Sequence, residues 1–491
     1  MKKEILYQEI ARTIACQIKK GVWKAGEKLP SLRTISNENG VSLNTAIQAY
    51  YELEKDGFII SRPKSGYIVN YKPIRLSVPA TTQPSVKPES KEVIDLIADV
   101  YSSLEIGDKS ITRFSLGMPE DILLPIAKLN KELIRAMQAL PGNGTRYDET
   151  QGNMRLRKSI ARFTYSWKGN LTEDDIVTTA GVTNAVALAL SVITKVGDTI
   201  AVESPVYFGM LQLHQLNHLL KNLANIFEQI RTLHMQFAIL ELPTNPVTGI
   251  DPDALKKVLP QIKACLLISN FNNPLGSCMP DEHKRVVVDM LAGYDIPLIE
   301  DDLYGDLFFG NSRPKPCKAF DKKGLVLWCG AVSKTLAPGY RVGWIAPGKF
   351  KHAIIRQKNI HLISTPALNQ EAVANFMEND RYENHLRKLR QELYANSIHF
   401  AHSIMDYFPE NTKIVTPQGG FMLWVELDKQ IDTTELYYRA MQRKISIAPG
   451  RMFTLQEQYT NCMRLSYGQR WTPLLEERLK QLGDIIKNHF N

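Results

Sequence analysis

A serine, a lysine and an arginine stand close together at Ser333, Lys334 and Arg341. An apolar run, Leu325 to Trp328, comes just before them and predicts a short buried strand. An amine kept from water near another cation has a lowered pKa and can form a Schiff base with an aldehyde. A hydroxyl and a guanidinium beside it can hold a phosphate. The group favours a site for an aldehyde that carries a phosphate, although an isolated Ser-Lys pair is far more typical of a basic surface loop.

A glycine turn offers a second place for a phosphate. Gly181 lies in Thr179 to Asn184, between the apolar pair Ile176-Val177 and an apolar helical stretch. The free N–H groups and the dipole of a helix N-terminus attract anions. Tyr207 follows shortly after and presents an aromatic face that can stack on a planar ring.

Two polar residues that follow predicted strands can complete the site. Asn273 lies in a turn after the strand Cys265 to Ser269, where its amide can donate to a phenolate oxygen. Asp301 follows the strand Ile296 to Ile299, and an aspartate there can pair with a pyridinium nitrogen, which makes the ring an electron sink. Each residue alone has an ordinary explanation as a turn, cap or core residue. Their order before Lys334 favours one shared site.

The chain that must position these residues reads as a soluble, multidomain protein. Its 491 residues predict two or three domains, and 44% hydrophobic with 23% charged residues is typical of globular proteins. No apolar run approaches the roughly 18 residues that span a bilayer, and no signal peptide is evident. The six cysteines form no Cys-x-x-Cys pair, which favours a reducing cytoplasm and argues against a metal site.

The positive charge is concentrated at the N-terminus. Residues 1–75 hold 13 Lys and Arg against 7 Asp and Glu, whereas the rest of the chain is nearly neutral. A small basic module favours a polyanionic partner. Apolar residues at helical spacing (Leu6, Ile10, Ile14, Ile18) predict one helix, and two more are expected from Pro30-Ser31 to Gly40 and from Ser42 to Gly57.

A hairpin with a basic tip, Arg62 to Gly66, would follow the three helices, which together predict a winged helix-turn-helix. In that fold the third helix enters the major groove of DNA. The predicted base-facing or phosphate-binding residues are Ser42, Asn44, Thr45, Arg33, Arg62 and Lys64. A small helical domain with a charged, solvated face is the alternative.

The order of short motifs in this head resembles the GntR family of bacterial DNA-binding domains. The motifs are Leu6 to Ile10, Gly26 to Arg33, Val41 to Thr45 and Leu53 to Phe58. Residues 112–485 resemble the fold-type I aminotransferases, which use pyridoxal 5′-phosphate. The combination is identified as a member of the MocR subfamily of transcriptional regulators. The resemblance implies a DNA-binding domain over 1–70, a linker over 71–110 and an α/β aminotransferase-like domain over 111–491.

The second resemblance also implies roles for individual residues. Lys334 would be the Schiff-base lysine, Asp301 the pyridinium partner, and Asn273 and Tyr304 neighbours of the phenolic oxygen, with Lys334, Asp301 and Tyr304 as the catalytic set. Tyr207 would stack on the ring. The phosphate would be held by Gly181, Val182, Thr183, Ser333, Arg341 and Tyr147 of the partner subunit. Arg464 would bind the α-carboxylate of an amino acid.

Two stretches depart from the aminotransferase pattern. Ala331 stands where the family often has a phosphate-binding hydroxyl. The passage from Met210 to Phe237 is longer and more apolar than usual, and its role is open. The proline-rich part of the linker is expected to be mobile.

The sequence therefore predicts a cytoplasmic homodimer, with no membrane association, that binds double-stranded operator DNA and pyridoxal 5′-phosphate. An amine or amino acid that reacts with the cofactor would be the effector and would bias a two-state arrangement of the domains. An active aminotransferase with an accessory DNA-binding head is the alternative from another class. A regulator that senses only cofactor supply is the third possibility.

Overall fold

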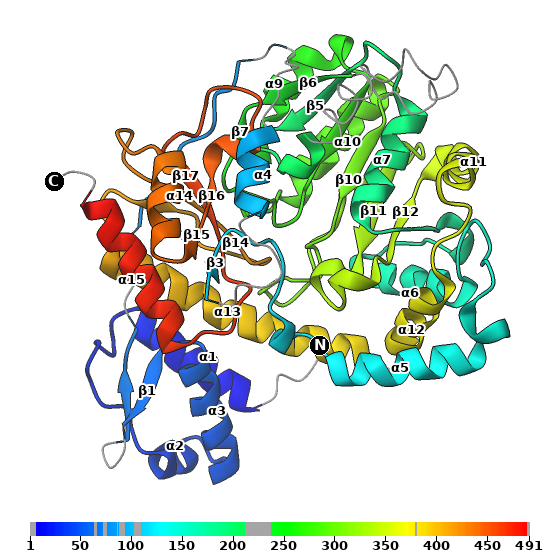
Figure 1. Ribbon diagram of the computed structural model, residues 1–491. Helices are drawn as coiled ribbons and strands as arrows, with labels where there is room; N and C mark the ends of the chain where they lie inside the picture. The colour runs from blue at the N-terminus through cyan, green and yellow to red at the C-terminus, as the bar shows by residue number, and fades with distance from the viewer. Residues whose placement is uncertain are drawn as a thin grey trace.

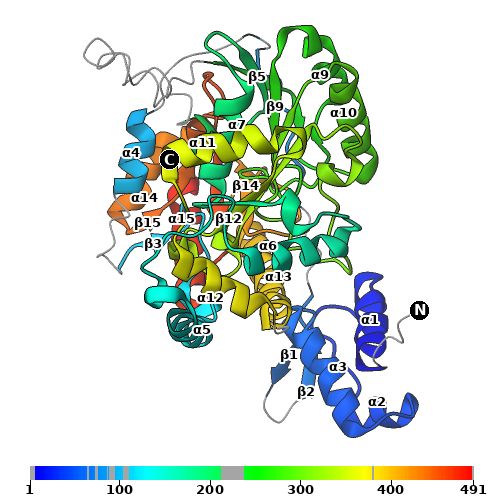
Figure 2. The ribbon, with the colours of Figure 1, turned by 90° about the vertical axis from the view of Figure 1, so that its right-hand side faces the viewer.

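The computed structural model describes residues 6–62, 66–71, 76–85, 87, 94–102, 110–211, 237–378 and 381–488 (Figure 1). Lys64 and the unusual passage between Met210 and Phe237, except for its ends, lie outside these residues. A small helical head lies at one end of a larger body that contains the main sheet (Figures 1 and 2).

The head has three helices followed by a hairpin, as predicted. Its elements are α1 (Leu6–Lys19), α2 (Leu32–Glu38), α3 (Leu43–Lys55), β1 (Ile59–Arg62) and β2 (Gly66–Val69). The two shorter helices begin at serines, because the side chains of Ser31 and Ser42 accept hydrogen bonds from the backbone N–H groups of Thr34 and Thr45.

The buried face of α1 is shorter than the sequence pattern predicted. Ile10, Ile14 and Ile18 lie in the core of the head, but Leu6 is 57% exposed. Leu6 is the first residue of the helix, where no described neighbour covers it. Periodicity alone does not indicate where the packing partner ends.

The central sheet of the body has seven strands, and its order is β4-β12-β11-β10-β9-β5-β6. Their bounds are β4 (Val177–Thr179), β5 (Thr199–Glu203), β6 (Ala238–Leu242), β9 (Ala264–Leu267), β10 (Leu298–Asp301), β11 (Val326–Ala331) and β12 (Gly343–Ala346). Only β12 runs antiparallel to its neighbours, so the expected, mostly parallel α/β sheet is present. Two strand ends differ from prediction: β11 continues to Ala331, and Asp301 is the last residue of β10 rather than a residue beyond it.

Helices cover both faces of this sheet. Strand residues Val202, Leu266 and Ile299 share a core with α7 (Val182–Ile193), while their neighbours pack with α9 (Pro252–Val258) and α10 (Asp281–Gly293). This alternation is the period of two expected for strands buried on both sides. The sheet therefore forms a rigid floor whose strand ends carry the predicted site residues.

The remaining elements surround this centre. The helices are α4 (Ile94–Ser102), α5 (Ile126–Ala139), α6 (Met154–Phe163), α11 (Lys351–Leu362), α12 (Ala367–Glu378), α13 (Arg381–Tyr407), α14 (Thr433–Gln442) and α15 (Pro473–Lys487). A four-stranded sheet contains β13 (Lys413–Ile414), β14 (Met422–Glu426), β17 (Cys462–Ser466) and β16 (Ala448–Pro449). Two short ribbons pair β3 (Thr112–Arg113) with β15 (Ile445–Ser446) and β7 (Thr244–Asn245) with β8 (Gly249–Ile250).

Parts of the predicted linker pack on the body. The hydroxyl of Thr82 donates to the carbonyls of Ser204, at 2.7 Å, and Thr244, at 3.2 Å. In α4, Ile97 and Val100 are buried in the main core. The expectation of a mobile proline-rich segment therefore does not hold at Thr82, which hydrogen bonds tie to the body, and α4 follows that segment. The domain boundary at residue 110 stays a prediction.

The long helix α13 lies between the head and the rest of the body (Figure 1). A Cβ placed on Gly57 of the head would lie 3.3 Å from Cγ2 of Ile398. Burial raises the pKa of Tyr394 to about 12, and the nearby charge of Asp56 adds to the effect. The second half of α13 is therefore the surface on which the head rests.

Candidate functional site

A cavity of about 110 Å³ opens where the strand ends of the main sheet meet the start of α7. It is lined by Val182, Thr183, Tyr207, Ile268, Asn273, Asp301, Leu303, Tyr304, Ser333, Lys334 and Arg341. Apart from the apolar Ile268 and Leu303, these are residues that the sequence singled out. Segments far apart in the chain thus converge on one small volume.

One end of the cavity is suited to a phosphate. Gly181 precedes α7 with φ of 87°, so the helix has no side-chain cap and its first N–H groups face the cavity. A Cβ on Gly181 would lie 2.3 Å from a terminal nitrogen of Arg341 and would displace that guanidinium, and the positive φ strains any other residue type here. The same guanidinium donates to the Ala180 carbonyl at 3.0 Å, and the buried hydroxyl of Ser333 has no hydrogen-bond partner. Together these groups leave unused donors for an anion.

Lys334 lies in a short 3-10 helix directly after β11, and its amine donates to the Gly117 carbonyl. Burial lowers the pKa of Lys334 to about 8, and the positive charge of Arg464 lowers it further, against the opposing effect of Asp301. At pH 7 roughly a tenth of this amine is therefore unprotonated, far more than for an exposed lysine. An unprotonated amine is the nucleophile that attacks an aldehyde.

Asp301 is placed by the parallel strand β10, and its carboxylate accepts a hydrogen bond from the N–H of Leu303 at 3.1 Å. Burial raises the pKa of Asp301 to about 7. A carboxyl group that is costly to ionise gains more from a cationic partner than an exposed one does. The side chain is thus suited to face a protonated ring nitrogen.

A hydrogen-bonded row continues from the cavity into the body. The amide of Asn273 donates to the hydroxyl of Tyr304 at 3.3 Å, and its oxygen accepts from the Arg464 guanidinium at 3.0 Å. Tyr207 lies against Phe208, with 4.5 Å between the ring centroids, and faces the same cavity. The row links groups that could bind a phenolic oxygen to an arginine that could bind a substrate.

Arg464 carries a buried positive charge on β17 and is 0% exposed. Its guanidinium donates to the Ser115 carbonyl and to Asn273, and its Nε has no partner. Within the described part of the chain it forms no ion pair with a carboxylate. A buried cation without a counter-ion favours an incoming anion, such as a carboxylate.

Some predicted residues lie apart from this cavity. Tyr147 is 81% exposed and does not line it, and Ala331 ends β11 with no hydroxyl to offer. In the head, Arg33 and Asn44 are exposed near the start of α2 and α3, while the hydroxyls of Ser42 and Thr45 hydrogen-bond each other at 2.8 Å. Arg62 ends β1, and Lys64 lies outside the described residues.

Sequence reasoning missed two supporting residues. Gly117 supplies the carbonyl that Lys334 contacts, although the two residues are 217 positions apart. Glu203 accepts hydrogen bonds from the Ile268 N–H at 2.7 Å and the Asn272 amide at 3.0 Å, which holds the turn that carries Asn273. Burial raises the pKa of Glu203 to about 8. For Glu203 the sequence did offer a signal, because an acidic residue there ends an apolar strand.

Among the residues that the structure describes, no group of three or more His, Cys, Asp or Glu side chains could hold a metal ion. No described helix combines the length and the apolar character that a membrane span requires.

Family models match the two parts of the chain separately. The model for bacterial regulatory proteins of the gntR family matches residues 6–69, and the model for aminotransferase class I and II matches residues 116–473. Among curated proteins, the HTH-type transcriptional regulators YjiR and YdcR of Escherichia coli (strain K12) are 36% and 34% identical. Each alignment covers 98% of this chain, with 98% of YjiR and 99% of YdcR.

Solved structures match the body. The α-aminoadipate aminotransferase LysN from Thermus thermophilus has a TM-score of 0.70 and 23% identity, over 81% of this chain and 96% of that one. The kynurenine aminotransferase of Pyrococcus horikoshii has a TM-score of 0.71 and 24% identity, over 82% and 96%. At this identity the likeness concerns the fold.

Proposed function

The chain belongs to the MocR type of GntR-family transcriptional regulators, with a body of the aminotransferase class I and II family, and from that premise we propose that it binds pyridoxal 5′-phosphate through Lys334 and responds to an amine or amino acid. The observation that carries the proposal is the convergence on one cavity of a lysine of lowered pKa, a buried aspartate and a group of donors suited to an anion.

The residues fit the cofactor. The start of α7, Ser333 and Arg341 would hold its phosphate, Asp301 would face its ring nitrogen, and Tyr207 would cover its ring. Asn273 and Tyr304 would bind its phenolic oxygen. When bound, this cofactor supplies an aldehyde that reacts with amines and a ring that withdraws electrons. The departure at Ala331 leaves the phosphate to the other donors.

Side chains of the protein would hold and transfer the protons in the cavity. Lys334 is poised to exchange a proton near pH 8, and the positive charges of Arg464 and Arg341 favour its neutral form. Asp301 near β10 keeps a negative charge available when a cation faces it. The apolar side chains of Ile268 and Leu303 limit the entry of water into the cavity.

The effector would be an amine that carries a carboxylate. Arg464 offers a buried guanidinium with an unpaired Nε, hydrogen-bonded to Asn273 at the cavity wall. An amino acid could pair its carboxylate with this arginine while its amine reaches the aldehyde. An amine without a carboxylate would leave the charge unpaired, so it should bind more weakly.

We also propose a homodimer whose interface includes two neighbouring loops. The hydroxyl of Thr150 lies 3.3 Å from Oδ1 of Asn359, which joins the loop of Tyr147 to the end of α11. Tyr147, Ile360 and Ile363 there are 81%, 64% and 51% exposed. A symmetric partner would cover these apolar side chains and could receive Tyr147 in its own cofactor cavity.

The head would bind operator DNA through the start of α3, with Arg33 and the hairpin near the phosphates. Asn44 and Arg33 are exposed and available, whereas Ser42 and Thr45 already satisfy each other. DNA in the cytoplasm would be the partner, read by two linked heads of a dimer.

Transamination is the second candidate function, because the lysine, the aspartate and the carboxylate-binding arginine are all retained. One experiment separates the two. The purified, cofactor-loaded protein is titrated with a panel of amino acids while cofactor absorbance, keto-acid formation and operator affinity are recorded together. If the protein is a regulator, an amino acid should change the cofactor absorbance and the operator affinity while little keto acid is formed. Steady keto-acid turnover with unchanged operator affinity favours the enzyme, and no absorbance change with any amine contradicts the effector proposal.

A further inference from the structure

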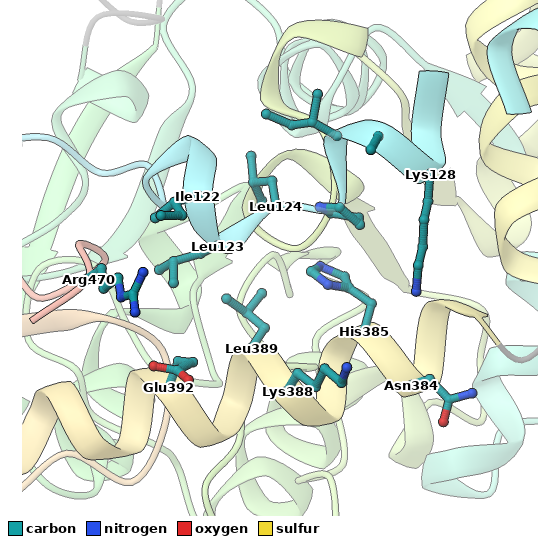
Figure 3. Close-up of a pocket in the computed structure, with 13 residues that line it drawn as sticks. Ile122, Leu123, Leu124, Lys128, Asn384, His385, Lys388, Leu389, Glu392 and Arg470 are labelled. Carbon is teal, nitrogen blue, oxygen red and sulfur yellow. The ribbon is translucent and has the colours of Figure 1, made fainter. Parts of the chain in front are cut away.

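A second and larger cavity lies away from the cofactor site, between the segment before α5 and the first half of α13 (Figure 3). Its volume is about 500 Å³, within the range of roughly 300–1,000 Å³ that holds drug-sized ligands. It is lined by Ile122, Leu123, Leu124, Pro125, Ile126, Ala127, Lys128, Asn384, His385, Lys388, Leu389, Glu392 and Arg470. None of these residues lines the cofactor cavity.

The charges in this cavity favour an anion. Lys128, Lys388 and Arg470 come from three separate segments and surround the opening, against one acidic residue, Glu392 (Figure 3). In the described part of the chain none of the three cations forms an ion pair. Burial lowers the pKa of His385, and the charges of Lys128 and Lys388 lower it further. The cavity lining thus carries three cations against one carboxylate, and a ligand with a negative group would reduce this excess of positive charge.

The walls are apolar. Leu123 and Leu124 on one side and Leu389 of α13 on the other lie between the cations (Figure 3). Leu389 is only 2% exposed, so it joins the cavity to the body core. A ligand that fits therefore has a charged end and an apolar body, because a fully hydrated ion would leave this wall unused.

The cavity is also connected to the cofactor site. Nε2 of His385 donates to the carbonyl of Thr335 at 2.6 Å, and Thr335 is the residue after Lys334. From the other side, Gly117 accepts a hydrogen bond from the Lys334 amine, and the chain runs from there directly to Ile122. One wall of the cavity thus contacts the Lys334 loop through His385, and another wall begins five residues after Gly117, which contacts the Lys334 amine.

We propose that this cavity binds a small organic carboxylate with an apolar body, as a second ligand of the regulator, and that its occupancy alters DNA binding through α13. The first half of α13 supplies His385, Lys388 and Leu389 to the cavity, and its second half supports the head at Tyr394 and Ile398. The ligand would therefore act on the helix that carries the head. The proposal does not depend on the chemistry of the cofactor site.

The test uses the full-length, cofactor-loaded protein and sodium octanoate, with 1-octanol as the neutral match. Calorimetric titration should detect octanoate binding, and octanol should bind at least about tenfold more weakly, because it lacks the charge. The double variant Lys388→Ala/Arg470→Ala should lose about tenfold or more in octanoate affinity. Lys429→Ala, which removes an exposed cation elsewhere, should bind as the wild type does. Equal binding of octanol, or unchanged affinity in the double variant, overturns the site.

Two further measurements test where octanoate binds and whether its binding affects the head. Lys334→Ala should still bind octanoate, because the ligand does not occupy the cofactor cavity; loss of binding there would place octanoate in that cavity and overturn the proposal. Octanoate should change operator affinity of the wild type in a gel-shift series but leave the double variant unchanged. An operator affinity that does not respond to bound octanoate contradicts the link through α13. Circular dichroism of each variant checks that it is folded.

Discussion

The head and the body use polar residues in opposite ways. In the head, the residues that would meet DNA are exposed, and they come from a few adjacent positions in the chain. In the body, the residues that would meet the cofactor are mostly buried, and they are brought together from strands, turns and helices along more than a hundred residues. Burial raises the pKa of Asp301 and lowers the pKa of Lys334, so both groups titrate close to neutral pH.

The difference indicates what each region can sense. An exposed side chain contributes through the contact it makes, and that contact is weakened by salt. Burial makes the charged form of a titratable group costly in free energy, and a bound ligand of opposite charge can offset that cost. Substitutions should therefore have graded effects in the head and large, pH-dependent effects in the body.

The largest effect is expected at the lysine. Lys334→Ala should abolish covalent retention of pyridoxal 5′-phosphate completely, because among the described residues no other lysine lines the cavity. Borohydride reduction followed by peptide mass analysis measures the attachment, with Lys322→Ala, an exposed lysine, as the control. In the wild type, capture of the aldehyde should become faster as pH rises toward about 8, since the neutral amine is the reactive form. Attachment at another lysine in Lys334→Ala would contradict the assignment.

The second effect is on stability. Burial raises the pKa of Glu203 to about 8 from its ordinary 4.5, so the folded state binds the extra proton between these values. Stability should then fall as pH rises through this window. Glu203→Gln should remove the share of this fall that is due to Glu203, which amounts to up to about 4 kcal/mol at pH 8, and leave the share due to Asp301. Chemical denaturation of the cofactor-free protein at pH 5 and pH 8 measures it. The exposed Glu457→Gln should leave the dependence unchanged; an equal slope in both variants would refute the cause.

A smaller, position-specific effect is expected in the head. Asn44→Ala should cost about 1–3 kcal/mol of operator binding at particular base pairs, because an exposed amide at the start of α3 can read a base edge. Binding to a set of singly changed operators measures the effect, with Asn37→Ala on α2 as the control. A uniform loss over all operators would instead assign Asn44 to the DNA backbone.

The smallest effect concerns a phosphate contact. Arg33→Ala should weaken binding to all sequences alike and reduce the slope of log affinity against log salt by about 0.9. The exposed Arg33 at the start of α2 is placed for such a contact. A salt series with the Lys429→Ala variant as reference measures the slope. An unchanged salt slope would show that Arg33 does not contact a DNA phosphate. The contrast between exposed contact residues in the head and buried residues in the body would then rest on fewer residues.

The sequence predicted the elements of the head and the residues that share the cavity around Lys334, because both depend on local motifs. Serine caps and apolar spacing specify α2 and α3, and strand ends followed by polar residues specify Asn273 and Asp301. It could not predict Gly117 or His385, whose partners lie far along the chain and are chosen by packing. The exposure of Leu6 and the packing of Thr82 were not predicted for the same reason. Periodicity and composition do not reveal which surface a segment packs against.

The continuity of α13 has a mechanical consequence. The helix runs without a break from the cavity residue His385 to Ile398, where the head packs, a length of roughly 20 Å. A tilt of about 5° over that length displaces Ile398 by about 2 Å, which is roughly half of the 3.4 Å spacing of bases along one DNA strand. A small rotation at the cavity could therefore shift the position of the head by a distance that matters for contacts to DNA.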